Sequence, residues 1–114
     1  MSVERMAELR RQLAQVTCDA REAADHYANC VVVAHQALLV SKGNDIKMVG
    51  SSEDARKLAF AAAVLESVEC GKAISAQRGL EYHAALYAAE LEALKDARKE
   101  RELDLLERQI LAAV

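Results

Sequence analysis

The chain has 114 residues, of which 53% are hydrophobic, and it carries a net charge of −3 with no proline and no tryptophan. This length favours a single domain spanning 1–114, and the lack of proline lets long helices run uninterrupted. No segment is strongly basic, so electrostatics alone give no support for strong duplex binding. No apolar run is long enough to cross a bilayer, so we expect no membrane partner.

The first predicted element is a helix over about 2–41. Its apolar residues recur at alternating spacings of three and four, which is typical of the contact line of a coiled coil. We call these ten positions the seam: Met6, Leu9, Leu13, Val16, Ala20, Ala23, Tyr27, Cys30, Ala34 and Ala37. Around 31–40 the flanking positions are apolar too, so this end of the helix needs at least two neighbours.

A polar break is predicted over 42–51, and the helix before it should end ahead of Gly43. Ser51 and Asp54 have the spacing of a capping box, which predicts a second helix over about 52–67. That helix is strongly apolar and is the natural cover for residues 31–40. Residues 46–49 are too apolar for a free turn and suggest a short extended piece packed on helix 52–67 or on a second subunit.

The third predicted helix covers about 72–112. Leu80, Ala84, Tyr87, Leu91 and Leu94 continue the pattern of threes and fours. A second apolar stripe then opens further along this helix, at Leu103, Leu106 and Ile110. In an antiparallel hairpin, Arg10 and Arg11 would lie within reach of Asp104 and Glu107.

The predicted fold is therefore all-α. Two long antiparallel helices form a coiled-coil hairpin, with a short capping helix between them. The surplus apolar surface predicts a homo-oligomer, most simply a dimer, forming an oligomeric helical bundle. The expected interface residues come from the middle and the C-terminal part of the chain: Val31, Val32, Leu38, Leu39, Ile46, Val49, Leu103, Leu106 and Ile110.

Few residues suggest chemistry. His26 and Cys30 lie four apart on one helix face, and His83 with Cys70 would complete a zinc-like set. The pairs fall on different elements without a short-spaced motif, so we expect no metal and no other cofactor. His35 lies in an apolar run with no second titrating group, which favours a structural histidine.

Other residue types also favour structural roles. Tyr27, Tyr82 and Tyr87 have helical or seam spacing, which favours core packing. The three cysteines, Cys18, Cys30 and Cys70, are an odd set without a C-x-x-C motif, which predicts reduced thiols in a cytoplasmic protein. These features together predict that the protein is not an enzyme.

The densest basic cluster is Lys95, Arg98, Lys99 and Arg101, interleaved with acidic residues. This pattern is typical of a solvated helix face with ion pairs at helical spacing. The alternative is a nucleic-acid-binding module in which oligomerisation aligns these four residues into one positive stripe.

The order of a long helix, the segment SKGNDIKMVGSSEDARKLAFAAAVLES and a charged helix AAELEALKDARKERELDLLERQI resembles a loose class of small phage and prophage helical-hairpin proteins. The residues that carry the resemblance are 50–57, GSSEDARK, followed by the apolar run 58–65. The resemblance covers most of the chain and implies a phage accessory protein in the host cell cytoplasm, near DNA recombination or host-interaction machinery. It implies no catalytic residue.

These observations predict a non-enzymatic, oligomeric helical accessory protein. Such a protein would work by presenting a helical surface to a protein partner, beyond its contact with itself.

Overall fold

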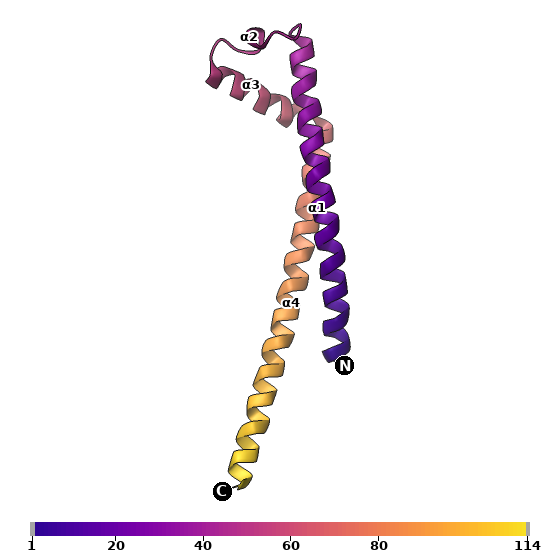
Figure 1. Ribbon diagram of the computed structural model, residues 1–114, viewed down its shortest axis with the longest axis vertical. Helices are drawn as coiled ribbons and strands as arrows, with labels where there is room; N and C mark the ends of the chain where they lie inside the picture. Colours follow the sequence, from indigo (N-terminus) through magenta and orange to yellow (C-terminus); the bar gives the residue numbers. More distant parts are fainter. Residues whose placement is uncertain (1, 114) are drawn as a thin grey trace.

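The computed structural model describes residues 2–113 and is all-α over that range. Four helices follow one another: α1 (Ser2–Ser41), α2 (Ile46–Val49), α3 (Glu53–Glu66) and α4 (Val68–Ala113). The long helices α1 and α4 pack antiparallel as a hairpin, while α2 and α3 form a head at one end (Figure 1). The predicted helical hairpin is confirmed. Its longest dimension is 85 Å.

The hairpin is held by a narrow apolar contact between α1 and α4. Leu9 is fully buried, and Met6 and Leu91 are nearly so. Leu13, Tyr87 and Leu94 pack against these three residues. The seam of α1 therefore faces the stripe of α4, as a pattern of threes and fours requires when two helices wind around each other.

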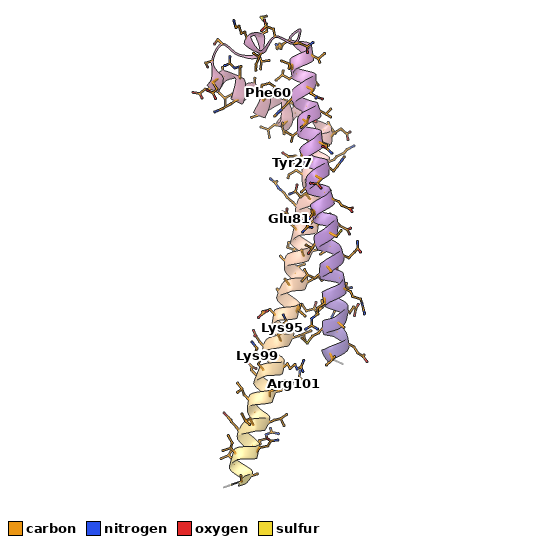
Figure 2. The ribbon with its side chains drawn as sticks, viewed as in Figure 1. Tyr27, Phe60, Glu81, Lys95, Lys99 and Arg101 are labelled. Carbon is orange, nitrogen blue, oxygen red and sulfur yellow. The ribbon has the colours of Figure 1, made fainter. Side chains whose placement is uncertain are left out.

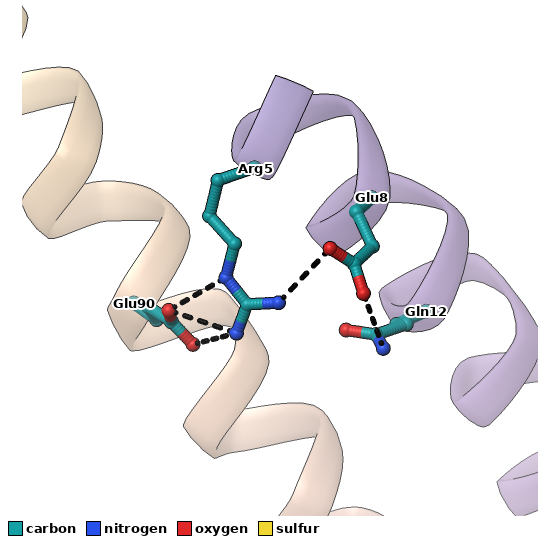
Figure 3. Close-up of polar contacts among 4 residues, drawn as sticks. All are labelled: Arg5, Glu8, Gln12 and Glu90. Carbon is teal, nitrogen blue, oxygen red and sulfur yellow. Dashed lines mark hydrogen bonds and ion pairs between the residues drawn. The ribbon is translucent and has the colours of Figure 1, made fainter. Parts of the chain in front are cut away.

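An ion pair between the two helices accompanies this core and marks its register. The Arg5 guanidinium donates to both carboxylate oxygens of Glu90, with Nε–Oε1 at 3.0 Å and Nη2–Oε2 at 2.9 Å (Figure 3). Arg5 also pairs with Glu8, at 3.3 Å. The hydrogen bond to Glu90 is the main reason that the pKa of Arg5 is raised. The raised pKa keeps the Arg5 guanidinium charged throughout the neutral range, so titration of Arg5 does not weaken the pair there.

This register corrects one expectation. Because Arg5 lies opposite Glu90, Arg10 and Arg11 lie opposite still earlier residues of α4 and far from Asp104 and Glu107. Asp104 instead pairs with Arg108 on its own helix, at 3.1 Å. The heptad pattern predicted the facing sides of the helices correctly but not their relative position along the axis.

The consequence is that α4 extends well past the N-terminal end of α1 (Figure 1). We call residues 98–113 the tail. Every side chain in the tail is exposed, and at 1.5 Å per residue it is about 24 Å long. None of the described helices combines the length and the apolar character needed to span a lipid bilayer.

The end of α1 is set by local chemistry. Gly43 and Asn44 both adopt positive φ, at 68° and 60°. Their amides donate to Val40 and Leu39 carbonyls at 3.0 and 2.9 Å, which is the hydrogen-bond pattern of a Schellman motif. Residues 46–49, expected as an extended piece, instead form the helical turn α2, because the Asp45 carboxylate accepts from the Lys47 amide and caps it.

The start of α3 differs by one residue from the capping box that the sequence suggested. Ser52, not Ser51, is the N-cap, and its hydroxyl accepts from the Ala55 amide at 3.1 Å. Gly50 lies close to the first turn of α3. A Cβ there would lie 2.8 Å from the Arg56 nitrogen, so the chain passes too close to the first turn of α3 for any larger residue.

The two serines provide a test of this assignment. Ser52→Ala should destabilise the first turn of α3 by about 1 kcal/mol, since a capped amide loses its acceptor, whereas Ser51→Ala should change little. Hydrogen exchange of the α3 amides measures the difference. Equal acceleration in both variants would contradict the assignment.

A single residue separates α3 from α4. Ser67 ends α3 with extended backbone, ψ 117°, and its hydroxyl accepts from the Cys70 amide at 3.2 Å, which caps α4. Helix α4 thus begins at Val68 rather than near residue 72, and Gly71 lies inside it. The break is a sharp bend at one serine instead of a connecting loop.

Because of this bend, α3 leaves the hairpin at an angle and covers little of α1 (Figure 1). The expected cover of residues 31–40 is only partial: Leu38 and Leu39 are half-buried, whereas Val32, Val33 and Val40 remain more than half exposed. Leu65 of α3 is 86% exposed. One contact between the two helices is the ring of His35 packed on Phe60, with centroids 4.8 Å apart.

Candidate functional site

The divergence of α3 from α1 leaves a groove of about 610 Å³ at the junction of α1, α3 and α4. Most of its floor comes from one face of α1, including Cys30, Val33, Ala34 and Leu38, and Ala63 of α3 lies on the other side. An apolar floor with a few polar groups at its edge is typical of a binding site for an apolar side chain or helix face. This groove is the main candidate site.

The rim of the groove is polar and carries negative charge. Glu66, Ser67 and Glu69 line one side, at the bend between α3 and α4, and His26 and Asn29 line the other. The described residues that line the groove include no lysine and no arginine. A ligand with an apolar core flanked by cationic groups would match this surface.

The groove also contains a contact between a thiol and an imidazole. Cys30 Sγ lies 3.7 Å from His26 Nε2, one helical turn away, so the sequence correctly placed these two on one face. Nucleophilic catalysis needs a third group that orients the imidazole. Among the described residues, no hydrogen bond to the other ring nitrogen of His26 is present. The thiol and the imidazole can therefore contact a ligand as polar groups, but they lack the third group that nucleophilic catalysis needs.

The four residues of the zinc-like set are not gathered into one site. Cys70 is buried at the start of α4, at 1% exposure. His83 lies further along α4 beside Tyr82 and Tyr87, with ring centroids 5.9 and 6.4 Å away. Nowhere in the described chain do three His, Cys, Asp or Glu side chains come close enough to share a metal ion.

The nine residues expected at an oligomer interface fall into two separate groups. Val31, Val32, Leu38, Leu39, Ile46 and Val49 lie in or near the head, whereas Leu103, Leu106 and Ile110 lie in the tail. Only Leu38 lines the groove. The three tail residues are 52–61% exposed, and Ile46 is 52% exposed. A single chain does not bring the two groups together.

The four basic residues of the nucleic-acid alternative all lie on α4. Figure 2 shows Lys95, Lys99 and Arg101 near or beyond the end of α1. Lys95 is half-buried and Arg98 pairs with Glu102 at 3.2 Å. Lys99 and Arg101 are about 200° apart around the helix and leave it on different sides (Figure 2). A single chain therefore presents no continuous positive stripe.

Sequence reasoning missed two features of these surfaces. It did not identify the groove, since residues 63–69 meet α1 only because of the bend at Ser67. It also placed Tyr82 in the core, which is wrong: Tyr82 is 62% exposed. Tyr82 lies nine residues from Leu91, which corresponds to about 180° around the helix. This spacing could have shown that the two side chains face opposite sides.

Comparison of the chain with protein-family models, curated proteins and solved structures found no match.

Proposed function

We propose that this protein is a non-enzymatic helical accessory protein that associates with itself and presents helical surfaces to a protein partner. The main support is that the chain exposes more surface than a compact monomer of the same mass. A folded monomer of 12.5 kDa typically exposes about 6,200 Å². This chain exposes 8514 Å², about 2,300 Å² more than that expectation.

The shape supports the same proposal. The radius of gyration is 24.6 Å, whereas about 13 Å is usual for a compact chain of this length. The surplus surface is rich in large apolar side chains, such as Leu58, Leu65 and Leu111, each more than 70% exposed. Monomeric proteins rarely leave extended apolar surface uncovered, so contact with another chain would stabilise this one.

The groove supports the second half of the proposal, contact with a different protein. Its apolar floor and acidic rim suit an amphipathic helix with basic flanks, a common mode of helix recognition. The resemblance to phage helical-hairpin proteins supports a partner in DNA recombination or host-interaction machinery. The separated positions of Lys99 and Arg101 give the nucleic-acid alternative less support.

Sedimentation velocity at micromolar concentration tests the self-association. We expect an elongated dimer, because each copy has more surplus surface than the roughly 800 Å² that a standard interface buries per partner. Circular dichroism on the same sample should show a predominantly helical protein. A monomer that keeps this helical content across the micromolar range would contradict the proposal.

A further inference from the structure

The side of α4 that faces away from α1 carries its own apolar line. We call it the outer face and define it by Val68, Tyr82, Leu86, Ala89, Leu103 and Ile110. All six are exposed, with Val68 at 68%, Tyr82 at 62% and Leu86 at 47%. Because Tyr82 lies half a turn from the buried Leu91, the two apolar lines occupy opposite sides of one helix.

The outer face follows a coiled-coil repeat. Val68, Tyr82, Ala89, Leu103 and Ile110 are separated by multiples of seven residues. On a straight helix such a line drifts by about 20° per heptad, and a partner helix that winds with a left-handed supercoil follows that drift. One partner helix can therefore contact both the central part of α4 and the tail, although the sequence pattern suggested two separate apolar stripes.

We propose that the outer face binds the outer face of a second copy, with the two α4 helices antiparallel and the two-fold axis near residue 85. This inference rests on the proposed self-association and specifies its geometry. Around the axis, the large side chains Tyr82 and Leu86 are flanked by the small residues Gly79, Ala89 and Ala93. Tyr82 of one copy then packs on Ala89 of the other, Leu86 meets its own copy at the axis, and the small flanking residues let the helices approach closely.

The charges on the outer face select the antiparallel direction. In a parallel pair in register, Lys72, Asp96, Glu100 and Glu107 would each meet their own copy, so like charges would face each other at four levels. An isologous antiparallel pair avoids all four of these contacts.

The antiparallel pair also creates favourable contacts. Lys72 and Asp96 lie at similar distances on the two sides of the axis, so each faces the other across the interface, and Arg78 faces Glu92 in the same way. Two-fold symmetry makes each contact occur twice. Glu69 lies close in level to both Glu100 and Asp104 of the other copy, and these unfavourable contacts fall near the ends, where solvent screens them.

The arrangement gives the tail a role. With the axis near residue 85, the tail of each copy lies beside the bend between α3 and α4 of the other, where Val68 is exposed. In this register Leu103 lies level with the start of the partner's α4, and Ile110 lies beyond it, on the side of the partner's bend. Two hairpins side by side thus cover surface along the length of α4, which matches the surplus area of about 2,300 Å² per chain better than a contact at one end would.

Cross-linking tests this geometry directly. In a variant with Cys18→Ser and Cys30→Ser, and with the buried Cys70 retained, a single Ala85→Cys lies next to its own copy. A short bis-maleimide should then give a covalent dimer. Glu100→Cys is the matched control, since its two copies would lie about 45 Å apart in the antiparallel pair and should not cross-link.

The outcomes separate this inference from the proposed function. Efficient cross-linking through Glu100→Cys would show a parallel pair and overturn the inference. A dimer in sedimentation with no cross-link through Ala85→Cys would place the contact elsewhere and leave self-association standing. A monomer in sedimentation would remove both.

A second pair of variants tests the face itself. Leu86→Lys places two cations near the axis and should weaken dimerisation about tenfold or more, while the helical content of the chain is retained because Leu86 is half-exposed. Leu105→Lys is the control, since it removes an exposed leucine from the opposite side of the tail and should leave the dimer unchanged. Equal weakening by both variants would overturn the inference.

Discussion

Replacing Leu9 with alanine is expected to lower the free energy of unfolding by about 3 kcal/mol, within the range measured for buried leucines. Leu9 has no exposed surface, and it lies in the small cluster with Met6 and Leu91 that joins α1 to α4. The cluster has few other members that could move in to fill the cavity. Because whole domains are stable by only about 5–15 kcal/mol, this loss should bring the hairpin close to unfolding at physiological temperature.

Urea unfolding at a fixed protein concentration measures the effect, since a self-associating chain has a concentration-dependent stability. Leu105→Ala is the matched control: the same atoms are removed from a side chain that is 56% exposed. The control should change the midpoint little. If Leu9→Ala and Leu105→Ala were equivalent, the α1–α4 contact would not be the core of the protein.

The second large effect is expected from adding volume where the helices approach most closely. Ala73→Leu should destabilise the hairpin by about 2 kcal/mol, because the extra methyl groups have no space between the helices. Ala73 is 4% exposed. Counting along the antiparallel helices from the Arg5–Glu90 pair places it opposite residues 20–27, where the seam consists mostly of alanine.

Ala76→Leu provides the comparison for this substitution. Ala76 lies on the same helix, less than one turn away, and is exposed, so the same added atoms should be tolerated. Thermal unfolding of the two variants at equal concentration distinguishes them. A variant Ala73→Leu that unfolds at the wild-type temperature would show that the alanines of the seam do not hold the helices close together.

Leu9 and Ala73 differ in how far the sequence alone could identify them. Leu9 follows directly from the spacing of threes and fours, because burial on a helix is a matter of which side a residue occupies. Ala73 lies before the predicted stripe of the third helix and was not singled out. Its burial depends on α4 starting at Val68, which the cap at Ser67 decides.

The groove shows the same distinction at the candidate site. The pairing of His26 with Cys30 could be predicted, since residues four apart on a helix are neighbours. The opposite side of the groove, at Ala63, Glu66 and Glu69, could not. Its position depends on the direction in which α3 leaves the hairpin, and that direction follows from the backbone angles of one residue, Ser67.

The sequence by itself determined that this protein is helical, where its long helices run, and which side of each faces the other. These properties follow from short-range periodicity, from the lack of proline and from the glycine that ends α1. The tertiary structure decided the register of α1 on α4, the bend at Ser67 and therefore the exposed tail. A shift of seven residues leaves a heptad pattern unchanged, so only the packing of Leu9 and Leu91 and the pairing of Arg5 with Glu90 select one register.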